Sequence, residues 1–373
     1  MPARRMLLMG YYGAHNLGDD MMLFCLQKWL ARQQVSITVL SEFPEEIQRS
    51  FGLPAVRNVP LLGEWSWVDA WLRGRALRVV RAILGHDGLI VGGGDLIRDD
   101  RGWRTFLFTL EKILLAILFR KPVYLVNVGI GRPHTSLGRR LLAWALPRCR
   151  KIIVRDQRSL DLCREFHAPA KYAPDIVLSL ERYLEERIAP PAGNPYAVVC
   201  LRNNPDAFQQ FAFGEQQVRS MAGILDHLVE HHGLEIVFLP FQSAAGNDDN
   251  QVHARIAAHM RNRGRATMRP WSGDLPEAAR CVAGAGCVVA MRLHAAVLAV
   301  AFHRPCLLLP YDHKVVEFGR QMRVAHAALP ENLEDLAALL PAIDQAVSQE
   351  TALRGGLEDF SWDRLTLSDP ALY

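Results

Sequence analysis

The sequence predicts an α/β protein with two Rossmann-like, doubly wound domains in tandem that face a cleft. Short apolar segments of strand length alternate with segments of helix length along most of the chain, which is typical of doubly wound parallel sheets. The 373 residues are too many for one ordinary domain and suit two. A turn-rich segment, Pro190-Pro191-Ala192-Gly193-Asn194-Pro195, interrupts the pattern and marks the expected domain boundary.

The strands expected before and after this boundary are short apolar runs bounded by turn-forming or charged residues. In the first domain they are Met6–Met9, Ile37–Ser41, Gly88–Val91, Val123–Val128 and Lys151–Val154. In the second they are Tyr196–Leu201, Glu235–Leu239, Cys287–Ala290 and Cys306–Leu309. We therefore expect domains over residues 1–189 and 190–330, followed by a C-terminal segment, 331–373, that contains an amphipathic helix from Glu331 to Val347.

The composition excludes several classes of protein. Half of the residues are hydrophobic and 22% are charged, as in an ordinary well-packed enzyme. A net charge of +4, without basic runs interleaved with aromatic residues, argues against nucleic acid as a partner. The seven cysteines form no C-x-x-C pair, which favours reduced thiols and a cytoplasmic location. We expect no secretory signal and no transmembrane segment, because charged residues break the longest apolar runs.

The segment from Trp65 to Leu84 combines tryptophans with four arginines. A basic helix of this kind can lie on an anionic membrane surface, so peripheral contact with the inner face of the cytoplasmic membrane is one interpretation. A packed helix with a solvated basic face is the simpler one.

Glycines and carboxylates follow the first predicted strand, in the segment Gly10-Tyr11-Tyr12-Gly13-Ala14-His15-Asn16-Leu17-Gly18-Asp19-Asp20. The segment opens a helix expected to run to about Leu30, which Asn16 and Asp19 can cap. The dinucleotide fingerprint G-x-G-x-x-G is missing. A carboxylate here would contact sugar hydroxyls or act as a base, although a capped strand-to-helix turn explains the same residues.

Other predicted strands of the first half also end in glycine or charge. Val91-Gly92-Gly93-Gly94-Asp95 places three consecutive glycines after one strand, which favours close approach of the backbone to a substrate. Asn127–Arg132 is a further glycine-bearing strand end. Arg155-Asp156 follows the next strand, where Arg155 can bind an anion or form a salt bridge with Asp156 or another neighbour.

Cationic residues gather at two strand ends of the second half. A strand over Gly286–Ala290 is followed by Arg292, His294 and a helix expected over Leu293–Phe302. The next strand is followed by Tyr311-Asp312-His313-Lys314. Ligands bind at the carboxyl ends of parallel strands, so these residues predict an anionic substrate, with the imidazole suited to proton transfer. The alternative is that His294 only caps or packs at the start of the helix. The nearby cationic residues Arg292 and Lys314 favour a functional role instead.

Together these segments resemble the polysaccharide pyruvyl transferase family. The matching motifs are G-Y-Y-G-x-x-N-x-G-D-D at Gly10–Asp20, G-G-G-D at Gly92–Asp95, V-R-D at Val154–Asp156, P-D at Pro174-Asp175, M-R-L-H-A at Met291–Ala295 and Y-D-x-K-V at Tyr311–Val315. The resemblance spans roughly Met6 to Phe318. Members usually carry Gly-Asp-Glu where this chain has Gly18-Asp19-Asp20.

The resemblance implies a fold like that of GT-B glycosyltransferases, with the acceptor on the N-terminal domain and the donor on the C-terminal one. The implied activity transfers a pyruvyl group from phosphoenolpyruvate to a sugar of a bacterial polysaccharide or its lipid-linked precursor, forming a ketal and releasing phosphate. By motif, the family's donor-site arginine, histidine and lysine fall on Arg155, His294 and Lys314, with Arg202 and Arg292 as competing arginines.

The chemistry of the donor agrees with this assignment, because a carboxylate and a phosphate need cationic subsites. We expect no metal and no cofactor. The predicted catalytic residues are His294 and Asp19, and the predicted substrate-binding residues are Arg155, Arg292, Lys314, Gly13, Asn16, Gly93, Gly94 and Asp95. Two alternatives stay open: a nucleotide-sugar-dependent glycosyltransferase of the GT-B fold, and a glycan-binding protein without activity.

Overall fold

A computed structural model describes residues 4–62, 65–99, 102–184, 195–202, 213–244, 246–309, 313–326, 336–348 and 360–367. The chain forms two compact units. Unit 1 contains Met1–Ala14, Asp19–Ile176 and Phe360–Tyr373, and unit 2 contains His15–Gly18 and Val177–Asp359. Each unit has a parallel sheet with helices on both faces, which confirms the predicted α/β class with two Rossmann-like domains.

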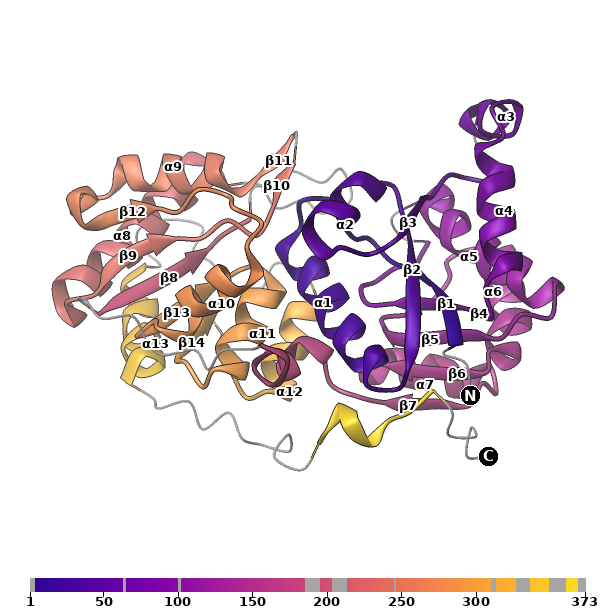
Figure 1. Ribbon diagram of the computed structural model, residues 1–373. Coiled ribbons are helices and arrows are strands. Elements are labelled where there is room, and N and C mark those ends of the chain that lie inside the picture. The colour runs from indigo at the N-terminus through magenta and orange to yellow at the C-terminus, as the bar shows by residue number, and fades with distance from the viewer. Residues whose placement is uncertain are drawn as a thin grey trace. The chain divides into compact units, whose positions relative to one another are not determined.

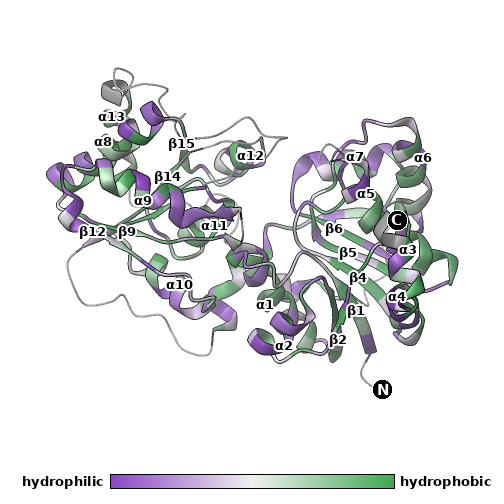
Figure 2. Cartoon of the chain, turned by 90° about the horizontal axis from the view of Figure 1, so that it is seen from above, coloured by the Kyte–Doolittle hydropathy of each residue, from purple (hydrophilic) through white to green (hydrophobic). Residues whose placement is uncertain are grey.

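The sheet of unit 1 has the strand order β3-β2-β1-β4-β5-β6-β7, with neighbours parallel throughout (Figure 1). The strands are β1 (Arg4–Met9), β2 (Val35–Ser41), β3 (Ala55–Arg57), β4 (Gly88–Gly92), β5 (Val123–Val128), β6 (Lys151–Val154) and β7 (Ala170–Tyr172). Strands β4 and β5 are buried along their whole length and are largely apolar, apart from Asn127, whose side chain hydrogen-bonds the backbone of Pro174 and Ile176 (Figure 2).

Helices cover both faces of this sheet. They are α1 (Leu17–Ala31), α2 (Pro44–Phe51), α3 (Trp65–Leu72), α4 (Arg75–Gly85), α5 (Trp103–Leu118), α6 (Ser136–Ala145) and α7 (Gln157–Glu165). On one face, alternate strand residues such as Leu7 and Val91 pack against α4, α5, α6 and α7 in one core. On the other face, Leu26 of α1 lies beside Leu8 of β1.

The sheet of unit 2 has the strand order β12-β9-β8-β13-β14-β15, again parallel throughout. The strands are β8 (Tyr196–Cys200), β9 (Glu235–Phe238), β12 (Ala266–Met268), β13 (Cys287–Ala290), β14 (Cys306–Leu308) and β15 (Ala325–His326). A short antiparallel hairpin joins β10 (Ser243–Ala244) and β11 (Asn247–Asp248).

The helices of unit 2 are α8 (Glu215–His232), α9 (Asp249–His259), α10 (Leu275–Ala283), α11 (Leu293–Ala301), α12 (His313–Gln321) and α13 (Leu336–Ser348). Alternate residues of the central strands, among them Val199 and Val289, form one core with α8, α9 and α13. Helix α11 packs on β13, and α10 packs against α11 (Figure 1).

The central strands lie where the sequence predicts them, but short edge strands were not predicted. Strands β3, β7, β12 and β15 have two or three residues each, too few for an apolar pattern. The segment from Trp65 to Leu84 is two helices instead of one, because Gly74 between them has a φ of +67°. Helix α13 is described from Leu336, so the start expected at Glu331 lies outside the described residues.

The structure divides the chain differently from the expected domains 1–189, 190–330 and 331–373. Unit 1 ends at Ile176, and residues 360–373 belong to it instead of forming a separate tail. Trp362 explains this return. Its ring packs against Trp29 of α1 at 5.5 Å between centroids, and its Nε1 donates to the Pro174 carbonyl. Much of the turn-rich segment around the expected boundary, residues 185–194, lies outside the described part of the chain.

Among the described residues, no helix combines the length and the hydrophobicity that crossing a bilayer requires.

Candidate active site

The predicted site residues cluster at the point in each sheet where the strand order reverses. In unit 1 the order reverses between β1 and β4, and in unit 2 it reverses between β8 and β13. Ligands of doubly wound sheets bind outside the carboxyl ends of such strands. The loops after β1 and β4 carry Gly13 and Gly93, and the turn after β13 carries Arg292. Each unit therefore has its candidate residues at the edge that this fold uses for ligands.

In unit 1, two glycines of the β4 loop lie against the start of α1. Gly93 and Gly94 have φ values of +67° and +75°, which side chains rarely adopt. A Cβ atom on Gly93 would lie 2.9 Å from the Met22 sulfur, and one on Gly94 would lie 3.6 Å from Oδ1 of Asp19. The predicted Asp19 and Gly94 are thus neighbours, and the glycine backbone leaves room beside the carboxylate.

Asp20 fixes the loop that contains Gly13. Its Oδ1 accepts a hydrogen bond of 2.8 Å from the Gly13 backbone N–H, and Gly13 has a φ of +75°. The pKa of Asp20 is raised to about 7, chiefly by burial; the Gly13 N–H acts in the opposite direction, and the charges of Asp19 and Glu46 add to the rise. A carboxyl that titrates near neutral pH at a strand end is typical of functional sites.

Tyr12 ties the β1 loop to the end of β4. Its side chain is buried, and its hydroxyl donates to the carbonyl of Gly92. A Cβ on Gly10 would lie 2.3 Å from the Tyr12 ring, so the ring needs a glycine there. Burial raises the pKa of Tyr12 well above its usual value, and the charges of Asp19 and Asp20 act in the same direction. Tyr12 therefore remains a neutral hydrogen-bond donor.

Arg155 lies between two carboxylates in unit 1. Its guanidinium is 2.6 Å from Asp95 Oδ1 and 3.3 Å from Asp175 Oδ2, and Arg98 also contacts Asp95. Burial alone would lower the pKa of Arg155, but Asp95 and Asp175 outweigh it and raise it. The salt bridge considered as the alternative for Arg155 thus exists, with these partners. Asp156 instead caps α7 by accepting from the Ser159 N–H.

In unit 2, residues 15–17 pair with the segment after β9. The Leu17 N–H donates to the Phe241 carbonyl at 2.9 Å, and the Ser243 N–H donates to the His15 carbonyl at 3.1 Å. The predicted Asn16 caps α1, because its Oδ1 accepts from the Gly18 N–H at 3.1 Å. These bonds hold the middle of the N-terminal motif on unit 2, while Gly13 and Asp19 belong to unit 1.

His294 occupies the space beside Gly18. A Cβ built on Gly18 would lie 2.1 Å from Nδ1 of His294 and 2.6 Å from Cγ. The imidazole therefore rests directly on the peptide backbone at the start of α1, and any side chain at position 18 would displace it. His294 itself stands in the first turn of α11, where helix N–H groups attract anions.

Arg292, the residue before α11, is fixed by Asp249. Its Nε and Nη2 contact the two carboxylate oxygens at 3.0 and 2.5 Å, a bidentate pair of two buried residues. The same carboxylate accepts from the backbone N–H groups of Phe241 and Gln242, each at 3.0 Å. A continuous set of contacts therefore runs from Arg292 through Asp249 to the segment that holds residues 15–17.

Lys314 lies in the first turn of α12, after β14, and is half-buried. Helix α12 packs against α11, which carries His294 in its own first turn. The competing Arg202 follows β8 and is buried. Tyr311 and Asp312 of the same motif lie outside the described residues.

His253 of α9 lies under this set of contacts. Its Nε2 accepts a hydrogen bond from the Leu201 N–H at 3.1 Å, and its ring packs on Phe238. Burial lowers the pKa of His253 to about 4. Its imidazole is therefore neutral and anchors the end of β8.

Three residues of this arrangement were not singled out from the sequence: Gly18 as the seat of His294, Asp249 as the partner of Arg292, and Asp20 as a carboxyl titrating near neutrality. Gly18 and Asp20 lie inside the predicted motif, but roles were predicted there for Asn16 and Asp19 instead. Asp249 follows Asp248 in a polar stretch without a distinctive pattern, and only the fold brings it to Arg292.

The fold and these residues define an enzyme-like α/β protein with two doubly wound domains and a cationic, imidazole-bearing strand end in the second. Residues 16–313 match the polysaccharide pyruvyl transferase family, so the chain belongs to this family.

Solved structures of similar fold include UDP-N-acetylglucosamine 2-epimerases. A putative one from Listeria monocytogenes has 12% identity and a TM-score of 0.60, over 95% of this chain and 93% of that one. MnaA of S. aureus, solved with UDP, has 10% identity and a TM-score of 0.63, also over 95% and 93%. The enzyme from Methanocaldococcus jannaschii has 12% identity and a TM-score of 0.61, over 93% of each chain. At this identity the likeness concerns the GT-B-type fold.

Proposed function

We propose that this protein transfers the pyruvyl group of phosphoenolpyruvate to two hydroxyls of a sugar in a bacterial polysaccharide or its lipid-linked precursor. The products are a cyclic pyruvate ketal and inorganic phosphate. The observation that carries the proposal is the position of His294. Its imidazole lies in the first turn of α11 and against the backbone of Gly18, and Arg292 is the residue immediately before that helix. Family membership supports the same activity.

The donor is assigned to unit 2. Its carboxylate and phosphate require positive charge and N–H donors, which Lys314 and the first turns of α11 and α12 supply. Arg292 stays a predicted binding residue, and its pair with Asp249 holds it in one orientation. Asn16 reaches the same unit through its pairing with the segment after β9.

In the proposed reaction, His294 donates a proton to the methylene carbon of phosphoenolpyruvate, which leaves an oxocarbenium-like centre at the neighbouring carbon. A sugar hydroxyl attacks that carbon and loses its proton to a base. The bond from carbon to the phosphate oxygen then breaks, phosphate departs, and a second hydroxyl closes the ketal. One such acid–base group contributes about a hundredfold to ten-thousandfold in rate.

The acceptor is assigned to unit 1. Asp19 is proposed as the base for a sugar hydroxyl, because its carboxylate lies beside the open backbone of Gly94. The neighbouring Asp20 holds the loop of Gly13 by accepting its backbone N–H, and Gly93 gives the β4 loop a positive φ. Arg155 and Asp95 remain predicted binding residues, and their ion pair also braces the strand ends around the glycines.

The decisive experiment measures phosphate release from phosphoenolpyruvate with a panel of sugar acceptors. His294→Ala and Lys314→Ala are expected to lose most of the turnover, whereas Arg320→Ala, an exposed residue at the other end of α12, serves as the matched control. If His294→Ala and Lys314→Ala turned over as fast as Arg320→Ala and the wild type, His294 and Lys314 would have no role in the mechanism. A glycosyltransferase would instead be stabilised by UDP or GDP and not by phosphoenolpyruvate.

Membrane contact is proposed as a second, peripheral property of the α3–α4 helices. Leu72 is 82% exposed, Trp71 is also exposed, and Arg78 and Arg81 lie on the exposed side of α4. Apolar side chains among arginines suit the headgroup region of an anionic bilayer. Co-sedimentation with anionic but not neutral vesicles is expected, and Leu72→Ser should weaken it. Leu118→Ser, at an exposed leucine of α5, is the control; equal loss in both variants would reject α3–α4 as the contact.

A further inference from the structure

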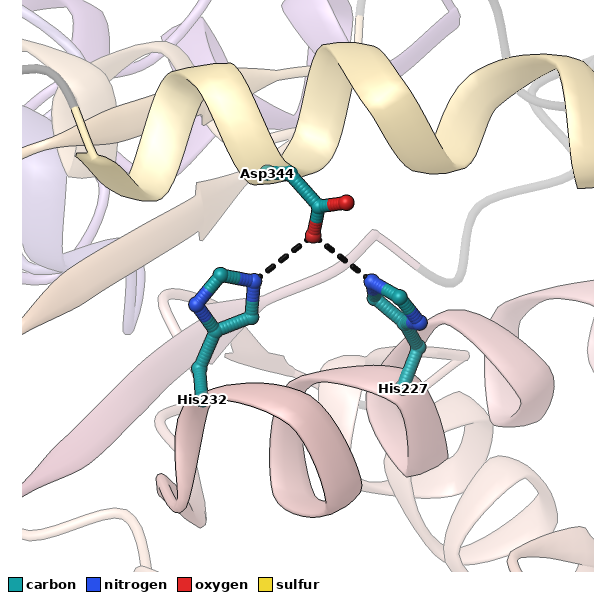
Figure 3. A group of neighbouring side chains, drawn as sticks. All are labelled: His227, His232 and Asp344. Atoms are coloured by element: carbon teal, nitrogen blue, oxygen red, sulfur yellow. Dashed lines mark hydrogen bonds and ion pairs between the residues drawn. The ribbon is translucent and has the colours of Figure 1, made fainter.

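A cluster of two histidines and one aspartate lies in unit 2, on helices outside the donor residues. His227 and His232 stand in the last turns of α8, and Asp344 stands on α13 (Figure 3). The Nε2 atoms of both imidazoles lie 2.7 Å from the same oxygen, Oδ1 of Asp344. One ligand atom from each of the three residues lies within 4.8 Å of the other two.

The protonation states follow from these contacts. Both imidazoles donate to the same carboxylate oxygen of Asp344, which acts as the acceptor of the two contacts. Each imidazole must then carry its proton on Nε2 and donate it to Oδ1. Two nitrogen atoms and one carboxylate oxygen thus face a common point. A metal ion at that point can replace both protons and link the nitrogens to the carboxylate.

We propose that His227, His232 and Asp344 bind one divalent transition-metal ion of the zinc type. Imidazole nitrogens favour Zn²⁺ over Mg²⁺ or Ca²⁺, which prefer oxygen ligands. With metal–ligand bonds of about 2.0–2.1 Å, a tetrahedral site separates its ligand atoms by about 3.3 Å. Each nitrogen–oxygen distance must therefore open by about 0.6 Å, and each Nε2 must give up its proton so that its lone pair can bind the ion.

The side chains allow this small change. Asp344 is 46% exposed and can rotate, whereas His227 and His232 are 12% and 19% exposed and hold their positions on one helix. The ring of His231 stacks on that of His227, with 4.3 Å between centroids. Water reaches the cluster through the exposed carboxylate and can fill the fourth position of a three-ligand site.

The bound ion would fasten α13 to α8. Ile343 and Ala346 are the buried α13 residues of the unit 2 core, and Pro341 inside the helix removes one backbone N–H donor. A metal bridge adds a strong link at the helix face where Asp344 points. The ion is thus inferred to be structural, and this inference does not depend on the proposed pyruvyl transfer.

The test titrates Zn²⁺ into the full-length protein after chelator treatment and dialysis. One ion per chain is expected, with a Kd below about 10 µM. His227→Ala, His232→Ala and Asp344→Asn should each weaken binding at least tenfold, about 1.4 kcal/mol by the standard conversion. His259→Ala is the matched control, because His259 pairs with Glu215 at 2.8 Å, at the opposite end of α8 from His227 and His232.

Two further readouts keep the result unambiguous. Co²⁺ bound at this cluster should lack the near-ultraviolet thiolate band, which would reveal capture by a cysteine instead. Zn²⁺ should slow hydrogen exchange in residues 336–348 of the wild type and leave Asp344→Asn unaffected. The proposal would be overturned if Asp344→Asn bound Zn²⁺ as tightly as the wild type, or if His259→Ala weakened binding as much as the ligand variants do. It would also be overturned if the wild type bound no Zn²⁺ at 100 times the expected Kd.

Discussion

The imidazole of His294 rests on the backbone of Gly18, with Nδ1 only 2.1 Å from where a Cβ on that glycine would stand. Residues 15–18 of the first motif and the R-L-H motif, which are far apart in sequence, therefore belong to the same unit. The backbone of Gly18 provides the surface that orients the proposed acid–base group.

Gly18→Ala is expected to reduce phosphate release about a hundredfold or more, because the methyl group pushes the imidazole out of position. The pH profile of the remaining activity should change with it. A double variant with His294→Ala should be no slower than His294→Ala alone, since both changes remove the same function. Additive losses in the double variant would show that Gly18 acts independently of His294.

Asp249→Asn is expected to destabilise the protein by about 3–5 kcal/mol, because it leaves the buried guanidinium of Arg292 without its charge partner. Urea unfolding measures the change. Glu215→Gln, which removes the charge of an exposed carboxylate paired with Arg219 and His259, should leave the free energy of unfolding nearly unchanged. Similar costs for the two variants would mean that the Arg292–Asp249 pair does not act as a buried unit.

Asp20 should make the protein less stable as the pH rises. Its pKa is about 7 in the folded chain against 3.8 for an unperturbed aspartate, so between these values the folded state binds more protons than the unfolded state. The free energy of unfolding contributed by Asp20 therefore falls as the pH rises through this window and levels off above pH 7.

Asp20→Asn keeps an acceptor for the Gly13 N–H and removes the charge. It should be up to about 4 kcal/mol more stable than the wild type above neutral pH, at 1.36 kcal/mol per pKa unit, and lose that part of the pH dependence. Urea unfolding at a series of pH values tests this. Asp161→Asn, at an exposed carboxylate of α7, should leave the slope unchanged. A wild-type slope in Asp20→Asn would contradict the raised pKa.

Trp362→Ala is expected to destabilise unit 1 by about 3–5 kcal/mol, because it removes a fully buried ring that packs on Trp29. Calorimetry should show a lower melting temperature for one transition while a transition of unit 2 stays in place. Trp144→Ala, at an exposed tryptophan of α6, is the control. If both transitions shift equally, the C-terminal segment stabilises more than unit 1.

The central strands were predictable because burial on both faces demands largely apolar runs, as in Val123–Val128. The strand-end positions of Asp19, Gly94 and His294 followed from the same alternation of strands and helices. What the sequence could not reveal depends on distant partners. Asp249 contacts Arg292, and Trp362 contacts Trp29, without any local pattern that announces either pair. Short edge strands such as Ala55–Arg57 carry too few residues to leave a signal.

The path of the chain restricts how this protein can be shortened or recombined. Residues 15–18 belong to unit 2 although they precede most of unit 1, and residues 360–373 belong to unit 1 although they follow unit 2. A fragment that stops at Ile176 would leave the ring of Trp29 uncovered, and one that starts at Val177 would lack Gly18. Gene fusions or exchanges between homologues must therefore move all three stretches of unit 1, or both stretches of unit 2, if the grafted unit is to fold.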